Sequence, residues 1–184
     1  MIGWIILIVV VVLVFWLIAM YNTLVRQKKR VENSWSQIDV QLKRRSDLIP
    51  NLVNAVKGYM KFESETLEKV MAARSKALNA NNMKDRMDAE GEVSGFLGRL
   101  LAVVENYPEL KANQNVMSLQ EELSNTENKI AYSRQFYNDI TMKYNTSIEV
   151  FPSNLIAKMF GFTPFEFFKI PEGEKEAPKV DLNF

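Results

Sequence analysis

The chain of 184 residues contains no cysteine and no histidine. These absences exclude disulfides, thiolate chemistry, Cys/His metal sites and the most common general base. A chain without histidine also cannot build the paired Glu-x-x-His motif of a di-iron helical bundle. We therefore expect no cofactor. The lack of cysteine is compatible with a bacterial cytoplasm.

Glycine and proline are scarce, with seven and six residues, and the common residues include Leu, Ala, Glu, Lys, Asn and Met. This composition predicts a mainly helical protein. The formal net charge is only +1, so no global field favours nucleic acid. The basic run Lys43-Arg44-Arg45 lacks interleaved aromatic residues, and we expect no nucleic-acid partner.

One long hydrophobic run opens the chain. Residues 1–25 carry no charged side chain, and residues 2–20 are almost wholly apolar. This run covers roughly 30 Å as a helix, the thickness of a bilayer's hydrocarbon core. Trp4, Trp16 and Tyr21 lie near its ends, as interfacial aromatic residues do. A cleaved signal peptide is disfavoured, because no basic residue precedes the run and no small-x-small cleavage site follows it. Residues 1–25 are predicted to be a retained transmembrane anchor.

A basic collar follows the apolar run. It consists of Arg26, Lys28, Lys29 and Arg30. The positive-inside rule places this side in the cytoplasm and the N-terminus outside. The prediction is a single-pass protein of the bacterial inner membrane. The collar could also hold anionic head groups of membrane lipid, although a plain topology signal is the favoured interpretation.

Residues 31–59 carry apolar side chains at alternating spacings of three and four, which predicts a helix with one apolar seam. The seam consists of Val31, Trp35, Ile38, Leu42, Ile49, Leu52, Val56 and Tyr59. Such a helix cannot cover its apolar face alone. Later segments must supply the surfaces that pack against it.

Pro50 allows two interpretations of this segment. Asp47 could cap a new helix with Pro50 in its first turn, or one helix could continue through Pro50 with a kink. The seam keeps its register across Pro50, so the kinked continuous helix is favoured. The apolar pattern then continues through Phe62 to Leu78, and the asparagine-rich residues 79–82 stop it.

Two further helices are predicted. One begins near Met83 and ends near Tyr107, and its glycines 91, 95 and 98 indicate either close helix packing or a fraying middle. The other carries a sustained heptad seam over residues 116–151, with a Tyr-Asn pair at 137–138 repeated at 144–145. Pro152 should end it. Ser153 should cap a short helix over residues 154–160, closed by Gly161.

Three stretches resemble the LemA family. They are YNTLVRQKKRVENSWSQIDVQLKRRSDLIPNLVNAVKGY (21–59), LQEELSNTENKI (119–130) and YNDITMKYNTSIEVFPSNLIAKMFGF (137–162), which with the apolar run are distributed from the first residues to position 162. The sequence departs from the resemblance at Phe62, where family members often carry histidine. The resemblance implies a single-pass membrane protein with a cytoplasmic antiparallel helical bundle, and it implies no agreed enzymatic activity.

The predicted fold is therefore all-α. A transmembrane helix (1–25) continues into a long antiparallel bundle of three to four helices with a short C-terminal helix (26–168), followed by a disordered tail (169–184). The phenylalanines at 160, 162, 165, 167 and 168 should cover the bundle end, with a partner or membrane surface as the alternative.

A polar network is predicted inside the bundle. Arg45 interrupts an apolar seam, so its guanidinium must reach water, pair with an acid or meet a partner. We expect it to pair with Glu127 and to fix the register of the helices. Asp47 and Arg134 are the other expected members. Clustered carboxylates elsewhere, including Glu90 with Glu92, are interpreted as solvated helix faces.

These patterns favour a membrane-anchored helical scaffold or adaptor that forms homo-oligomers or binds protein partners. A membrane-shaping protein that uses the basic collar and the aromatic patch is one alternative. A metal-dependent enzyme built on carboxylates is a weaker one, because no nucleotide-binding or nucleophile motif occurs.

Overall fold

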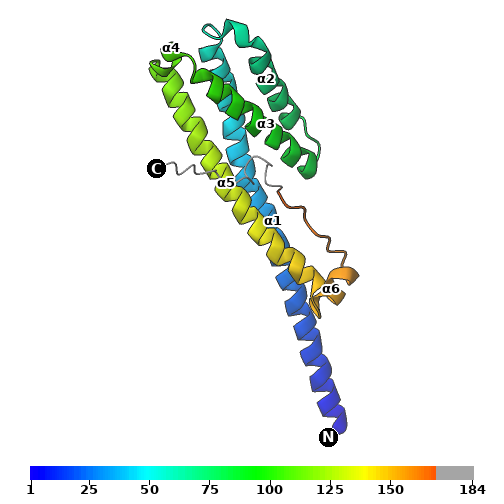
Figure 1. Cartoon of the computed structure of the whole chain (residues 1–184). Coiled ribbons are helices and arrows are strands. Elements are labelled where there is room, and N and C mark those ends of the chain that lie inside the picture. Colours follow the sequence, from blue (N-terminus) through cyan, green and yellow to red (C-terminus); the bar gives the residue numbers. More distant parts are fainter. Residues whose placement is uncertain (169–184) are drawn as a thin grey trace, which may run out of the picture. The chain divides into compact units, whose positions relative to one another are not determined.

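The computed structural model describes residues 1–168, and the predicted disordered tail lies outside this range. The described residues form six α-helices and one short 3₁₀ helix, without strands (Figure 1). The all-α prediction is confirmed. The chain divides into two compact units: unit 1 contains residues 1–40 and 130–167, and unit 2 contains residues 41–129 with Phe168. The predicted 26–168 bundle therefore contributes residues to both units.

Helix α1, Ile2–Val56, is a single helix of 55 residues with Pro50 inside it. Of the two interpretations of Pro50, the structure contains the one helix that runs through it and not a new helix capped by Asp47. Ile49 and Leu52, on either side of the proline, are both fully buried. The seam therefore stays in register because both flanking positions face the same core.

The helix does not continue to Leu78 as the apolar pattern suggested. It ends at Val56, whose carbonyl accepts hydrogen bonds from the N–H groups of Tyr59 and Met60, both at 3.0 Å. The 3₁₀ helix Lys61–Glu63 and α2, Ser64–Leu78, follow. Gly58 lowers helix propensity at this point, and the buried Met60 fixes the turn in the core. Phe62, through which the apolar pattern is predicted to continue, is 97% exposed.

Unit 2 is a helical bundle. The last part of α1 packs with α2, with α3 (Met83–Val104), with the short α4 (Pro108–Lys111) and with the first part of α5 (Gln114–Glu149). Asn82 caps α3, because its side-chain oxygen accepts the N–H of Asp85 at 2.8 Å. The core includes Ile49, Leu52, Val56, Val70, Leu97, Leu100, Leu110, Val116 and Leu123.

The glycines of α3 do not mark a close helix contact. A Cβ atom built at Gly91, Gly95 or Gly98 meets no atom within 4 Å. Helix α3 runs unbroken past all three positions. The structure therefore supports neither close packing nor a frayed middle as their cause.

In unit 1, the first part of α1 packs against the last part of α5. The rings of Trp35 and Tyr137 lie 5.9 Å apart, and those of Tyr21 and Phe160 lie 4.7 Å apart. Residues earlier in α1 thus meet residues later in the chain, which is the antiparallel arrangement.

The short helix α6, Ser153–Met159, ends in a Schellman motif. Gly161 has φ +69°, and the N–H of Phe162 donates to the carbonyl of Ala157 at 2.9 Å. The prediction that Ser153 caps this helix is wrong. Its hydroxyl donates instead to the carbonyl of Ser147 (2.6 Å), near the end of α5, and to that of Val150 (3.0 Å), just after it.

Candidate functional site

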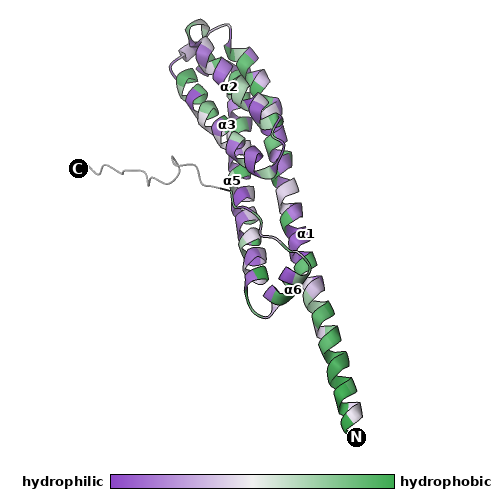
Figure 2. Ribbon diagram, turned by 90° about the vertical axis from the view of Figure 1, so that its right-hand side faces the viewer, coloured by the Kyte–Doolittle hydropathy of each residue, from purple (hydrophilic) through white to green (hydrophobic). Residues whose placement is uncertain are grey.

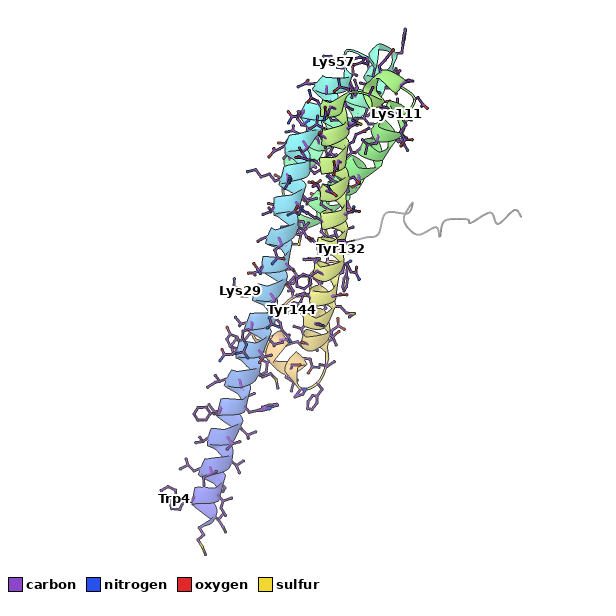
Figure 3. All side chains as sticks on the ribbon, turned by 90° about the vertical axis from the view of Figure 1, so that its left-hand side faces the viewer. Trp4, Lys29, Lys57, Lys111, Tyr132 and Tyr144 are labelled. Atoms are coloured by element: carbon purple, nitrogen blue, oxygen red, sulfur yellow. The ribbon has the colours of Figure 1, made fainter. Side chains whose placement is uncertain are left out.

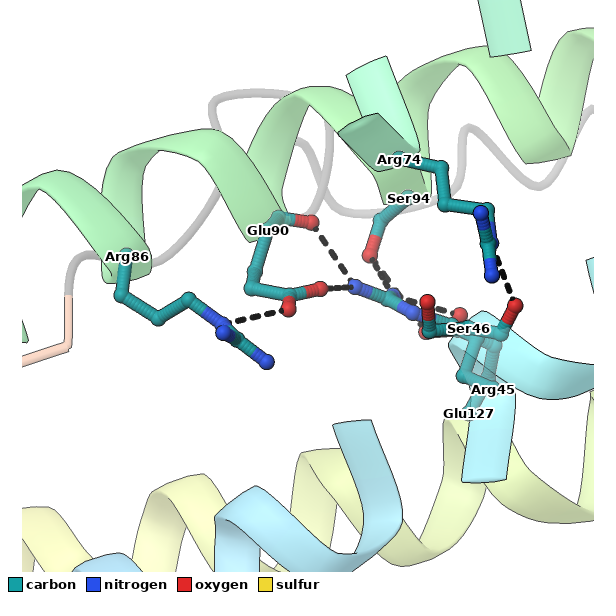
Figure 4. Close-up of polar contacts among 7 residues, drawn as sticks. All are labelled: Arg45, Ser46, Arg74, Arg86, Glu90, Ser94 and Glu127. Atoms are coloured by element: carbon teal, nitrogen blue, oxygen red, sulfur yellow. Dashed lines mark hydrogen bonds and ion pairs between the residues drawn. The ribbon is translucent and has the colours of Figure 1, made fainter. Parts of the chain in front are cut away.

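The most distinctive polar site lies inside unit 2, around the fully buried Arg45 of α1 (Figure 4). Its Nη1 donates to Glu127 Oε1 of α5 at 2.6 Å and to Ser94 Oγ of α3 at 2.5 Å. Its Nη2 donates to the carbonyl oxygen of Glu90 at 3.1 Å and also forms a short ion pair with the Glu90 carboxylate. One guanidinium thus joins three helices.

Glu90 is the second buried charge of this site. Its carboxylate also accepts Arg86 Nε, one helical turn earlier, at 2.9 Å. The network formed by Arg45, Arg86, Glu90, Ser94 and Glu127 therefore has two positive and two negative charges. Balanced charge and good hydrogen bonds are what a buried ion-pair network needs to offset its desolvation.

A second arginine explains how α1 passes through Pro50. In an α-helix, the residue at position 50 would donate its N–H to the carbonyl of Ser46, and proline has no N–H. Arg74 Nε, from α2, donates to that same carbonyl at 2.6 Å (Figure 4). Ser46 is buried, so this bond satisfies an oxygen that water could not reach easily.

The structure brings together two of the four residues expected in the network. Arg45 and Glu127 are in contact, whereas Asp47 is exposed on the surface of α1. Arg134 is half-buried and belongs to unit 1, outside this site.

The interpretation of Glu90 as a solvated acid is wrong, although Glu92 beside it is exposed. A usable signal existed: Glu90 lies three residues after Met87 and seven before Leu97, so it interrupts an apolar seam as Arg45 does. Opposite charges that interrupt two facing seams are expected to meet.

The anchor residues lie along the exposed first part of α1. Figure 2 shows this segment as one continuous hydrophobic stretch, and none of its apolar window is buried. By length and composition it could cross a membrane. Trp4 and Trp16 are exposed, while Tyr21 also contacts Phe162, with ring centres 5.8 Å apart. The four collar side chains are all exposed; Lys29 pairs with Glu32 at 2.6 Å and Arg26 donates to Thr23 at 3.0 Å.

The repeated Tyr-Asn pair of α5 holds the extended segment that follows α6. Tyr144 donates to the carbonyl of Thr163 at 3.1 Å, and Tyr137 donates to that of Glu166 at 2.9 Å. Seven helical residues span about 10.5 Å and three extended residues about 10 Å, so the two periods match. The phenolic groups therefore bind carbonyls three residues apart.

Asn145 fixes the register of this segment. Its amide accepts the N–H of Phe165 at 3.0 Å and donates to the carbonyl of the same residue at 2.9 Å. The aromatic patch divides accordingly: Phe162 and Phe165 are half-buried and Phe168 is buried, whereas Phe160 and Phe167 remain exposed. Part of the patch covers the helices, as favoured from the sequence.

Burial raises the pKa of both phenols. For Tyr137 a hydrogen bond with Thr141 opposes this rise in pKa and the charge of Glu166 adds to it, while for Tyr144 the charge of Glu32 adds to it. In the unfolded chain tyrosine titrates near pH 10. The unfolded state therefore ionises first, so the stability from these neutral phenols is complete below about pH 10 and is lost as pH rises through the folded pKa.

We expect the melting temperature of the full chain to fall steeply above about pH 10, and less steeply in Y137F/Y144F. At pH 7 the double variant should lose about 1 kcal/mol per missing hydrogen bond. Thermal circular dichroism across pH measures both effects, with the exposed Tyr132 (Figure 3) replaced by phenylalanine as the control. If the melting temperature of the double variant falls above about pH 10 as steeply as that of the wild type, the two buried phenols do not cause the fall.

An apolar groove of about 500 Å³ lies in unit 2, between the end of α1 and the start of α2. Its apolar lining includes Val53, Met60, Leu67 and Met71, and its rim includes Lys57 and Glu68. The exposed Phe62 lies in the connection between the same two helices. Among residues 1–168, no group of three or more acidic side chains is placed to hold a metal ion.

These observations define an all-helical protein whose first helix is long and apolar enough to cross a membrane and then enters an antiparallel bundle. The chain belongs to the LemA family, whose model matches residues 34–182. This family is not a known enzyme family.

Two kinds of relative are similar to the chain. Protein LemA of Metamycoplasma hominis is 29% identical over 155 residues, which cover 84% of this chain and 71% of that protein. Magnetosome protein MamQ 2 of Paramagnetospirillum magneticum is 26% identical over 186 residues, covering 87% of this chain and 68% of the relative. Magnetosome protein MamQ of Magnetospirillum gryphiswaldense is 24% identical, with 83% and 65% covered.

Proposed function

We propose that this protein is a membrane-anchored helical scaffold that works by self-association at the membrane of a bacterial cell. The observation that carries the proposal is the continuity of α1. One helix without a linker contains both the exposed apolar span and Arg45, the centre of the buried network. In a scaffold of this kind the membrane span and the bundle belong to one helix, with no separate linker segment between them.

The exposed basic collar supports an orientation for the proposed anchor in the membrane. Its four cations follow the span directly, with no acid before Glu32. The positive-inside rule then places the bundle in the cytoplasm and the N-terminus outside. The names of the MamQ relatives connect them with magnetosomes, which is compatible with a task at a membrane.

Phe62 and the neighbouring groove support self-association. A phenylalanine that is 97% exposed is costly to leave in water, and Phe62 lies in sequence between Met60 and Ser64, which both line an apolar groove of about 500 Å³. In a two-fold contact the same surface patch of both copies meets. An exposed side chain of each copy can then enter the groove of the other copy. The proposed partner is therefore a second copy of this chain, with Phe62 of each copy in the other's groove.

The test measures the mass of the full-length protein in mild detergent by light scattering. We expect assemblies of at least two chains of 21.2 kDa for the wild type and mainly single chains for Phe62→Ser. Phe136→Ser, at a half-exposed phenylalanine of unit 1, is the matched control and should leave the mass unchanged. A monomeric wild type would overturn self-association, and an unchanged mass in Phe62→Ser would overturn the role of the groove.

A membrane-shaping role is the second candidate. The exposed collar and the exposed Phe160, which contacts Tyr21 at the end of the span, favour it. It predicts that the protein changes the diameter of liposomes that contain anionic lipid. Equal diameters with and without the protein would reject it.

A further inference from the structure

Helix α6 and the residues beside it present an apolar stripe without cover. Phe151 is 78% exposed, Leu155 58%, Met159 74% and Phe160 56%. The first three recur at intervals of four residues, which places Leu155 and Met159 on one face of α6. Ile156 and Ala157, on the other side of the helix, are buried. Large apolar side chains thus occupy the side of α6 that a helix in water would keep polar.

The stripe lies close to the end of the candidate membrane span. Phe160 and Phe162 both contact Tyr21, with ring centres 4.7 Å and 5.8 Å away. Tyr21 directly follows the apolar run of residues 2–20, so these contacts hold α6 at the end of the candidate span. Figure 2 shows α6 beside the point where α1 changes from hydrophobic to hydrophilic. This is the level of the lipid head groups if residues 2–20 cross the bilayer.

The charges around the stripe favour contact with the head groups of an anionic membrane surface. Lys158 lies in the last turn of α6, and the collar begins five residues after Tyr21. Glu149, at the end of α5, is the nearest acid in sequence. Basic residues next to an apolar face are typical of helices that lie in the interface of an anionic leaflet.

We propose that α6 is a second membrane contact, in which Phe151, Leu155 and Met159 enter the boundary between head groups and acyl chains. The inference rests on the proposed membrane anchor. A helix of seven residues would bind a bilayer weakly alone, but α1 holds it at the surface, so little affinity is needed. Two contacts at different points of unit 1 would set the rotation of α1 in the membrane, which a single span does not.

The absence of cysteine makes a direct test possible. Single-cysteine variants of the full chain, L155C and M159C, are labelled with the polarity-sensitive dye NBD and reconstituted into vesicles containing anionic lipid. Spin-labelled lipids serve as quenchers. L13C reports the span, and Y132C, which lies 17 helical residues or about 26 Å before the end of α5 at Glu149, reports the exposed surface of α5.

We expect a quencher near the head groups to reduce the emission at positions 155 and 159 at least about fivefold more than at 132, as an interfacial depth requires. A deep quencher should act most strongly at position 13. Quenching at 13 with none at 155 and 159 overturns the α6 contact while leaving the anchor intact. No quenching at position 13 overturns the anchor itself. Blue-shifted emission at 155 without quenching by lipid indicates burial against a second copy, and also overturns the membrane contact.

Discussion

Arg45→Met is expected to lower the free energy of unfolding by about 3–5 kcal/mol, the cost of breaking a buried ion pair. The substitution leaves the almost fully buried Glu90 carboxylate with Arg86 as its remaining cation. It also removes the donors that reach Ser94 and Glu127. Unfolding of the full-length protein in detergent, followed by circular dichroism at 222 nm, measures the loss.

The neighbouring Arg44 provides the matched control. Its side chain is 52% exposed and lies 3.9 Å from Glu122, so Arg44→Met should change the stability by less than about 1 kcal/mol. Equal losses in the two variants would contradict a special role of the buried network.

A double-mutant cycle between Arg45 and Glu127 separates this pair from the rest of the network. We expect a coupling of about 1–3 kcal/mol, because the two charged groups share one short hydrogen bond. A coupling indistinguishable from zero would reject the proposal that this pair fixes the register of α1 and α5. R45M/E90M should recover part of the stability lost in R45M, because it removes both buried charges.

Arg74→Met is expected to cost about 1–3 kcal/mol in the wild type, since it leaves the buried Ser46 carbonyl without its donor. In a Pro50→Ala background the same substitution should cost less than about 1 kcal/mol. Alanine at position 50 regains the N–H that bonds to this carbonyl within the helix. The same unfolding measurement in all four combinations gives the comparison.

Lys76→Met, at an exposed position of the same helix, controls for the loss of a cation from α2. It should behave alike with proline or alanine at position 50. If Arg74→Met costs the same in both backgrounds, the arginine does not replace the missing hydrogen bond of Pro50.

The limits of sequence reasoning are clearest around α1. The continuous helix through Pro50 could be predicted, because the seam holds its register on both sides. The turn at Gly58 was missed, because Tyr59 and Phe62 extend a plausible apolar pattern and one glycine is a weak signal. Periodicity shows which side chains are apolar, but it does not show whether they are buried in a core or exposed to water.

The sequence by itself determined the apolar first segment, the basic collar, the helical class and the presence of a charge in the seam of α1. Each of these depends only on the type and spacing of residues within one segment, so it can be predicted without knowing which other segments pack against it. Only the tertiary structure decided that Glu90 pairs with Arg45, that Arg74 donates to the carbonyl left without a partner by Pro50, and that Phe160 at the end of α6 contacts Tyr21. Those partners are 28 to 139 residues apart, and nothing but the packing of the helices brings them within reach.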